Sequence, residues 1–213
     1  MNGFPIVLTG LADRRCVVVG GGAVAARKAA ALVEAGAHPV VVSPQFAPEL
    51  AEMASAGQVE LLERRYRQGD LAGAALVIAA TDDRAVNAAV FGEAQSRGIP
   101  VNVVDHPELC TFILPAVVRR GELLIAVSTG GGSPALARHL REVLEAAVDP
   151  AYGELLALLA GLRPRVRREV PPASQRAVWD RLLDGELLSC LRFNGVEAAR
   201  RLAEQIVQDA AAR

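Results

Sequence analysis

The stretch CVVVGGGAVA, residues 16–25, joins an apolar run to three consecutive glycines. A continuous run of this kind is typical of a strand that is buried on both faces. The residues that follow it are strong helix formers as far as Gly36, so we expect a helix to begin directly after the glycines. The order strand, glycine turn and helix indicates a site for a phosphate-containing ligand, because the first turn of the helix presents free backbone amides.

The glycines match the dinucleotide-binding pattern GxGxxG/A, with Gly20, Gly22 and Ala25 in its three small-residue places. In this pattern the first glycine makes a tight turn, the second lets the backbone approach a pyrophosphate, and the third lets the helix pack closely. We therefore expect Gly20, Gly22, Ala23 and Val24 to contact a dinucleotide cofactor. The alternative is a tight turn without a ligand.

The second expected strand lies in HPVVVSP, residues 38–44. Dinucleotide-binding folds usually carry an acidic residue here to hold the adenosine ribose, but this chain has Ser43 followed by Pro44. Ser43 can still hydrogen-bond a hydroxyl, so Ser43 and Pro44 remain candidate cofactor-binding residues. A serine neither requires NAD nor repels the phosphate of NADP, and the sequence only leans toward NAD.

The alternation of strands and helices continues to about residue 112. A helix is expected over 47–56 and is followed by VELLERR (59–65). ALVIAAT (75–81) is a third buried run, a helix is expected in the segment 82–98, and PVNVVD (100–105) is a further strand. Such alternation predicts an α/β fold with an open parallel sheet of the Rossmann type. Thr81 and Asp82 would then lie at the carboxyl edge of the sheet, where such folds bind ligands, although either could instead cap the following helix.

After residue 112 the pattern changes. The segment 112–129 predicts two strands joined by a turn at 119–122, and Ser133 and Pro134 predict the N-cap and first position of a helix. From about residue 150 the chain is helical, punctuated by Pro164, Pro171–Pro172 and Gly185. We expect a Rossmann-type domain at 1–112, a strand–strand–helix dimerisation segment at 113–149 and a small helical domain at 150–213.

Composition limits the class of protein. Of the 213 residues 52% are hydrophobic, which is enough for a sizeable core, and the formal net charge of −1 gives no general attraction to nucleic acid or anionic membranes. The three cysteines are far apart and suit a reducing compartment. Without a signal-peptide pattern or a stretch long enough to span a membrane, we expect a cytoplasmic protein.

Four stretches resemble the precorrin-2 dehydrogenase family, the NAD-dependent part of siroheme synthase, in the family's order and spacing. They are FPIVLTGLADRRCVVVGGGAVAARKAAALVEAGA (4–37), VIAATDDRAVN (77–87), VNVVDHPELCTFILPAVV (101–118) and LLIAVSTGGGSPALARHLRE (123–142). The tail from residue 150 fits the family's helical domain in length and character. No methyltransferase domain of the kind that some siroheme synthases carry follows it, so the resemblance implies the stand-alone form.

The resemblance implies that the protein uses NAD to oxidise precorrin-2 to sirohydrochlorin, and some members of the family also insert ferrous iron to give siroheme. The family's catalytic aspartate, at the end of the strand in NVVD, corresponds to Asp105. A carboxylate there could accept protons in both steps. The alternative for Asp105 is a turn or helix-cap residue. His106 is interpreted as a loop histidine, and because no histidines have metal-ligand spacing we expect no permanent metal site.

The tetrapyrrole substrate carries many carboxylates and needs cationic and amide donors. Ser128, Thr129 and Gly130 lead into an expected helix N-terminus, and Arg119 and Arg138 flank them, so these five residues are candidate substrate ligands. A second arginine cluster lies in RPRVRRE, residues 163–169. The alternative for each cluster is a solvated face. The resemblance also implies a homodimer that pairs through the strand–strand–helix segment.

A different class of function is the non-catalytic NAD-binding domain that regulates potassium transport, which VGGGAVA and the later AATDD also resemble. Those domains usually keep an acidic residue where this chain has Ser43. A domain of that class also does not account for Asp105 and the later STGGGSP turn, residues 128–134.

Overall fold

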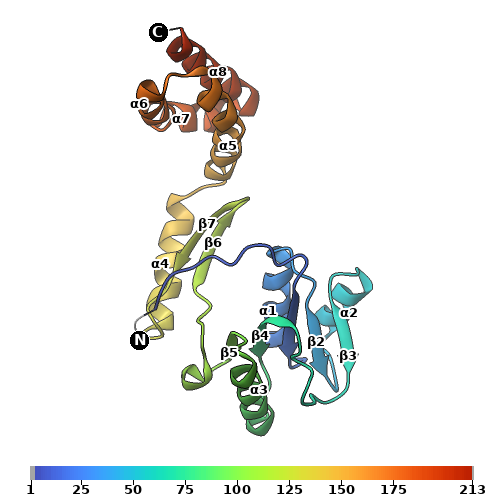
Figure 1. Cartoon of the computed structure of the whole chain (residues 1–213). Helices are drawn as coiled ribbons and strands as arrows, with labels where there is room; N and C mark the ends of the chain where they lie inside the picture. Colours follow the sequence, from blue (N-terminus) through green and yellow to red (C-terminus); the bar gives the residue numbers. More distant parts are fainter. Residues whose placement is uncertain (1–2, 213) are drawn as a thin grey trace. The chain divides into compact units, whose positions relative to one another are not determined.

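The structure is a computed structural model that describes residues 3–212. The chain divides after Leu114 into two compact units, which are treated separately below (Figure 1). Among the described residues, no helix combines the length and the apolar character needed to cross a bilayer.

The first unit alternates strands and helices along the chain. Its elements are β1 (Arg15–Val19), α1 (Ala23–Glu34), β2 (Val40–Ser43), α2 (Pro48–Ser55), β3 (Glu60–Glu63), β4 (Ala74–Ala79), α3 (Arg84–Arg97), β5 (Val101–Val103) and the short 3₁₀ helix η1 (Pro107–Leu109). These bounds confirm the strand–helix alternation expected from the sequence.

The five strands form one parallel sheet in the order β3-β2-β1-β4-β5. In this register Val18 of β1 lies between Val41 of β2 and Ile78 of β4. The chain runs outward in one direction from β1 to β3 and then continues on the other side with β4 and β5. The strand order therefore reverses between β1 and β4, which is where doubly wound folds open a crevice for ligands.

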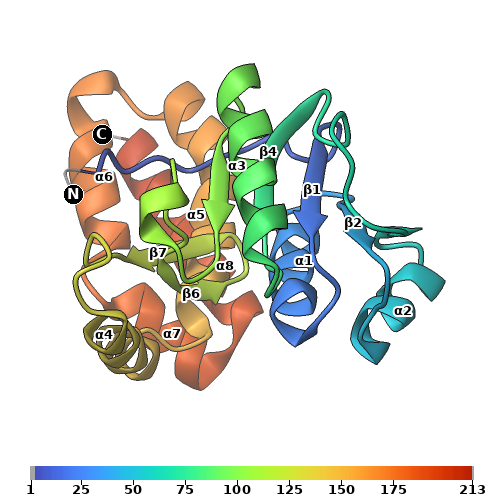
Figure 2. The same cartoon turned by 90° about the horizontal axis from the view of Figure 1, so that it is seen from below.

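Helices cover both faces of this sheet, and β1, β2 and β4 are almost entirely buried, as their apolar runs predicted. One core contains Val18 and Ile78 together with Leu32 of α1 and Leu50 of α2. The other contains alternate strand residues with Val90 and Ala94 of α3. Alternation of side chains along each strand thus places α1 and α2 on one face and α3 on the other (Figure 2).

The second unit begins with a hairpin and continues with helices. Its elements are β6 (Ala116–Arg120), β7 (Leu123–Val127), α4 (Pro134–Ala147), α5 (Ala151–Glu169), α6 (Pro172–Leu182), α7 (Glu186–Asn194) and α8 (Val196–Ala211). Strands β6 and β7 are antiparallel and pair as far as Arg120 with Leu123. The turn is therefore confined to Gly121 and Glu122 and is shorter than the sequence suggested.

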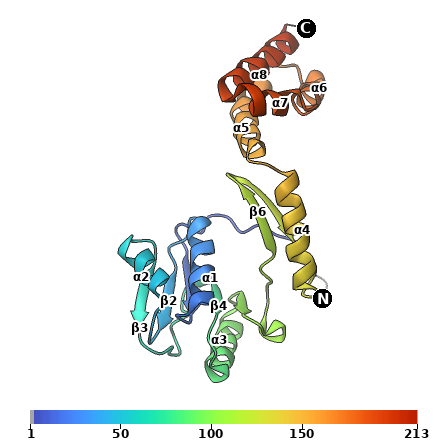
Figure 3. The same ribbon diagram turned by 180° about the vertical axis from the view of Figure 1, so that it is seen from behind.

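Helix α4 packs on the hairpin, and α5 to α8 enclose a third core that includes Leu162, Val166 and Val207 (Figure 3). Ser133 is the N-cap of α4, accepting a hydrogen bond from the Leu136 amide at 3.2 Å, as predicted. The expectation of a break at Pro164 was wrong, because α5 continues through it. Pro164 lies on the exposed side of α5, where the burial of Leu162 and Val166 on the other side outweighs one lost backbone hydrogen bond.

Candidate functional site

A cavity of about 650 Å³ opens at the carboxyl edge of the parallel sheet, a volume in the range of small-molecule and cofactor sites. It lies at the reversal of strand order, and its walls come from the loops after β1, β2, β3 and β4. The lining residues are Val19, Gly20, Gly21, Gly22, Ala23, Val24, Val42, Ser43, Pro44, Gln45, Phe46, Ala47, Arg65, Tyr66, Ala80, Thr81, Asp82, Asp83 and Val86. All eight residues that the sequence suggested for the cofactor are among them.

The glycine turn forms the floor of this cavity. Gly20 has φ +127°, and a Cβ there would lie 2.2 Å from the carbonyl oxygen of Ala80. At Gly21 a Cβ would lie 1.9 Å from the carbonyl oxygen of Gln45. These two positions need glycine for packing within the protein. A Cβ at Gly22 meets nothing within 4 Å, so this position is open toward a ligand.

The amides at the start of α1 are suited to phosphate. Gly22 is the N-cap of α1 and supplies no side-chain hydrogen bond to the helix. The first amides of a helix lack partners within the helix, and its dipole favours negative charge at this end. The residues at this turn therefore fit the pyrophosphate of a dinucleotide, and the open space at Gly22 is where it would approach.

The end of β2 forms the next wall. Ser43 is buried, and its Oγ lies 3.5 Å from the Gln45 amide nitrogen, so the hydroxyl stays within the loop that it begins. Ser43 and Pro44 lie where the sequence placed them, beside the glycine turn. Here the usual acidic side chain is absent and the wall is uncharged.

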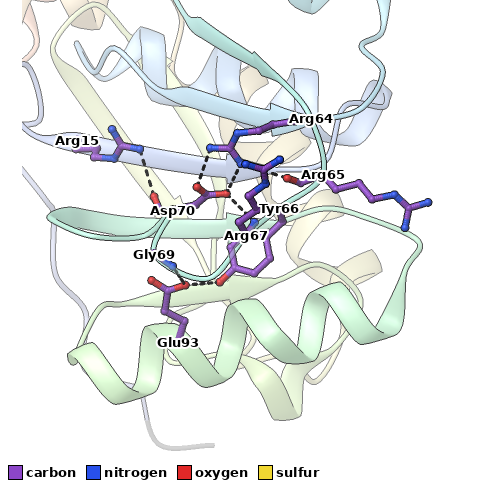
Figure 4. A network of polar contacts seen from close by, with 8 residues as sticks. All are labelled: Arg15, Arg64, Arg65, Tyr66, Arg67, Gly69, Asp70 and Glu93. Atoms are coloured by element: carbon purple, nitrogen blue, oxygen red, sulfur yellow. Dashed lines mark hydrogen bonds and ion pairs between the residues drawn. The ribbon is translucent and has the colours of Figure 1, made fainter.

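Two lining residues that sequence reasoning missed, Arg65 and Tyr66, follow β3. The Tyr66 hydroxyl donates to the buried Glu93 carboxylate at 2.5 Å, and the Gly69 amide donates to the same oxygen at 2.9 Å (Figure 4). Burial alone would raise the pKa of Glu93, but these two bonds and the bond from Arg97 hold it below its ordinary value. Burial and the bond to Glu93 raise the pKa of Tyr66.

A second ion pair fixes the other side of the same loop. Both terminal nitrogens of Arg64 donate to the Asp70 carboxylate at 2.8 Å, and the Arg67 amide donates to it as well. The bond from Arg64 is the main reason that the pKa of Asp70 is lowered. Arg15 of β1 donates to the Asp70 carbonyl oxygen at 3.2 Å, so the segment from Arg64 to Asp70 is held to the sheet by Arg15 and to α3 by Glu93 (Figure 4).

Thr81 and Asp82 line the cavity, but neither caps α3, so that alternative was wrong. The N-cap is Asp83, whose carboxylate accepts from the amides of Ala85 and Val86. The Thr81 hydroxyl accepts from the Asp83 amide at 2.9 Å and so shapes the turn before the helix. Helix α3 begins two residues later than Asp82, which leaves the Asp82 carboxylate at the cavity.

Asp105 lies in a turn two residues after Val103, the last residue of β5, which is beside β4 at the same edge of the sheet. It is exposed, and it has φ +62°, the one left-handed non-glycine residue among those described. Its carboxylate makes no hydrogen bond or ion pair within residues 3–212, and the cap of η1 is His106 instead. Burial and Arg27 lower the pKa of Lys28 in α1, and the negative charge of Asp105 opposes this shift.

Cys110 holds the loop that carries Asp105. Its thiol lies 3.3 Å from the Val103 amide nitrogen and 3.2 Å from the Val103 carbonyl oxygen. His106 is partly buried, and its Nδ1 lies 3.0 Å from Glu108, so it is paired within this loop. In the part of the chain that the structure describes, no three His, Cys, Asp or Glu side chains gather as metal ligands would.

The candidate substrate residues lie in the second unit. Thr129 Oγ1 accepts from the Ser133 amide and donates to its carbonyl, both at 3.1 Å, and Ser128 Oγ accepts from the Gly130 amide. These hydroxyls therefore shape the turn before α4. Arg119 of β6 and Arg138 of α4 are exposed and make no side-chain hydrogen bond or ion pair with any described residue.

Three family models match consecutive parts of the chain. Residues 7–116 match a family described as putative NAD(P)-binding, residues 120–147 the central region of a sirohaem biosynthesis protein, and residues 151–207 the sirohaem synthase dimerisation region. The first match covers the unit that contains the cavity.

Relatives and a solved structure agree with these matches. Siroheme synthases of Methylobacillus flagellatus and Methylococcus capsulatus are each 45% identical, over 97% and 100% of this chain but 44% and 45% of their own length. That of Pseudomonas aeruginosa PAO1 is 47% identical over 92% of this chain and 42% of its own. The chain thus spans less than half the length of these relatives.

The solved structure of SirC, a precorrin-2 dehydrogenase, superposes with a TM-score of 0.71 at 26% identity, covering 97% of this chain and 100% of the other. This likeness extends over both units, and the family matches follow one another along the same length. The chain belongs to the family of siroheme synthase and precorrin-2 dehydrogenase, and it contains that family's NAD(P)-binding, central and dimerisation regions.

Proposed function

We propose that the protein oxidises precorrin-2 to sirohydrochlorin with NAD as the acceptor, in the biosynthesis of siroheme. The observation that supports this most directly is the unpaired Asp105 carboxylate at the sheet edge that also holds the glycine-lined cavity. Membership of the siroheme synthase family and the likeness to a precorrin-2 dehydrogenase support the same substrate.

In this proposal the glycine turn and the amides of Ala23 and Val24 hold the pyrophosphate, and Ser43 and Pro44 contact the adenosine end. Thr81 and Asp82 border the opposite side of the cavity. Once bound, a nicotinamide supplies the acceptor for the hydride that leaves the substrate. Asp105 acts as the general base that takes up the accompanying proton, which its exposure and its lack of a partner allow.

The substrate carboxylates need hydrogen-bond donors, and the second unit has exposed arginine side chains that can serve as such donors. Arg119 and Arg138 are not engaged with other described residues, so their guanidinium groups are free to bind carboxylates with two hydrogen bonds each. The start of α4 after Gly130 adds backbone amides at a helix N-terminus. We assign these groups, with Ser128 and Thr129, to substrate binding.

A homodimer is part of the proposal. Residues 151–207 match the sirohaem synthase dimerisation region, and we assign residues 113–149 to the pairing as well. Leu136, Leu140 and Val143 lie one helical turn apart along α4, and all three are exposed in the isolated chain. A second copy would cover them and the edges of the β6–β7 hairpin. We also place the protein in the cytoplasm, a reducing compartment that suits cysteines without disulfide partners.

The test is anaerobic incubation of the purified protein with precorrin-2 and NAD while NADH absorbance is recorded. NADH formation that requires both the protein and precorrin-2 is expected. If folded protein binds NAD but forms no NADH, the proposal fails and the non-catalytic NAD-binding alternative takes its place. Sedimentation at micromolar concentration tests the dimer, and monomer alone would contradict it.

Iron insertion is a second proposed activity, because the same free carboxylate can accept the pyrrole protons that ferrous iron displaces. Ferrous iron is a substrate in this step. Adding it after oxidation should give siroheme faster than in a protein-free control. An equal rate in both would restrict the protein to the dehydrogenase step.

A further inference from the structure

Arg65 is a cation on the cofactor cavity that the proposed function leaves without a role. It lines the same cavity as Ser43 and Gln45, and its side chain is exposed. Its guanidinium donates no hydrogen bond and forms no ion pair within residues 3–212. In Figure 4 the side chain extends away from the network around it.

The backbone that carries Arg65 is fixed on both sides. Arg64 is bound to Asp70 through two hydrogen bonds of 2.8 Å, and the Tyr66 hydroxyl is bound to Glu93 at 2.5 Å. The polar groups of Arg64 and Tyr66 are therefore already hydrogen-bonded within the protein. Of these three residues, only Arg65 has a polar group that is available to a ligand. Because its neighbours are fixed, its backbone is held beside the cavity.

Arg65 is the one basic residue among the described residues that line the cavity. The acidic lining residues, Asp82 and Asp83, follow β4, and Asp83 is occupied as the cap of α3. Arg65 follows β3, on the far side of β2 and β1 from β4. Glu63, which pairs in register with Ser43, is not among the lining residues.

The end of β2 is where dinucleotide-binding folds distinguish the two nicotinamide cofactors. An acidic residue there binds the free 2′-hydroxyl of the adenosine ribose, and an arginine nearby accommodates a 2′-phosphate. This chain has the neutral Ser43 in the acidic position and Arg65 on the neighbouring loop. A guanidinium binds a phosphate in a planar, two-bonded geometry.

We propose that Arg65, beside the neutral Ser43, binds a phosphate on the 2′-position of the adenosine ribose, so that the cavity accepts NADP as well as NAD. This rests on the proposed function only in taking the cavity as the dinucleotide site. Arg65 is then a residue that determines cofactor specificity.

The test measures binding by calorimetry, with 2′,5′-ADP and 5′-AMP as probes and without the tetrapyrrole. The wild-type protein should bind 2′,5′-ADP at least as tightly as 5′-AMP. Arg65→Gln should weaken 2′,5′-ADP about tenfold, the loss expected for one charge-assisted hydrogen bond, and leave 5′-AMP within about twofold. Arg67→Gln is the matched control, because Arg67 is exposed on the same loop but does not line the cavity, and it should change neither affinity.

A second variant tests the same assignment from the β2 side. Ser43→Asp restores the usual acidic residue and should weaken 2′,5′-ADP strongly relative to 5′-AMP. The proposal is overturned if wild-type protein binds 2′,5′-ADP more than tenfold more weakly than 5′-AMP, or if Arg65→Gln leaves the ratio of the two affinities unchanged. Normal phosphate discrimination without precorrin-2 oxidation would refute the proposed function alone, so the two failures are distinguishable.

Discussion

The Cys110 thiol lies 3.3 Å from the carbonyl oxygen of His106 and closes the short loop that carries Asp105. The same sulfur lies 3.3 Å from the amide nitrogen of Val103, the last residue of β5. Burial raises the pKa of this thiol, so it stays protonated and can donate to the carbonyls of the loop. Asp105, with its left-handed backbone, therefore lies between Val103 and His106, and the Cys110 side chain contacts both of these residues.

Cys110→Ala should loosen this loop while the cofactor cavity, to which Cys110 does not contribute, stays intact. We expect a loss of stability of about 1 kcal/mol, the usual value for a hydrogen-bonding group, and a fall in the rate of oxidation. The affinity for 5′-AMP should not change. Cys190→Ala is the control. Cys190 is partly buried and packs against the core of the second unit, so the variant should cost stability without changing the rate per folded molecule.

Asp105→Gly separates a functional role from a structural one. Glycine adopts φ +62° without strain but gains more freedom on unfolding, so the stability of the variant should stay within about 1 kcal/mol of the wild type in urea unfolding. Loss of the general base should reduce oxidation by about 100-fold or more. Asp105→Asn keeps the shape and tolerates the same φ, and we expect it to lose activity equally.

The control for Asp105 is Glu34→Gln at the exposed end of α1, which should leave oxidation unchanged. If Asp105→Gly keeps full activity, Asp105 is not the base. If it loses stability together with cofactor affinity, the residue serves the fold instead.

Gly22→Ala tests the open position in the glycine turn. Because a Cβ there meets no protein atom within 4 Å, stability should stay within about 1 kcal/mol of the wild type. The added methyl group would occupy the approach of the pyrophosphate, so we expect NAD affinity to fall at least tenfold in calorimetry. Gly92→Ala, at an open position in the middle of α3, should gain about 1 kcal/mol and bind NAD normally.

Glu93→Gln should change how stability depends on pH. Since the pKa of Glu93 is held below its ordinary value in the folded state, its stabilisation is fully present above about pH 4.3 and is lost as the pH falls through the folded value. The variant should be less stable than the wild type by about 1–3 kcal/mol at pH 7, and the difference should shrink in acid. Urea unfolding between pH 3 and 7 measures both effects.

Glu52→Gln, on the exposed side of α2, provides the baseline for that series and should leave the pH profile unchanged. A constant difference between Glu93→Gln and the wild type at every pH would mean that the carboxylate is not held in its charged form by Tyr66 and Gly69.

Local patterns in the sequence were enough to predict much of the first unit. The buried runs around Val18 and Ile78 and the glycine turn between β1 and α1 depend on neighbours within a few residues. For the same reason Ser133 was identified as the cap of α4, since capping involves only the next turn of chain. The prediction of an interruption at Pro164 was wrong, because tertiary packing holds α5 together there. Such packing is not contained in any local sequence pattern.

By itself the sequence determined the strand–helix alternation, the glycine turn and the motifs that mark the family, because each is written in contiguous residues. Only the tertiary structure decided which distant residues share the cavity. Arg65 and Tyr66 reach it because β3 lies beside β2, and Tyr66 is held by Glu93, which is 27 positions away and buried despite its charge. From the sequence pattern alone, a glutamate such as Glu93 is expected to face the solvent. Its burial is favourable only because Tyr66, Gly69 and Arg97 donate hydrogen bonds to its carboxylate.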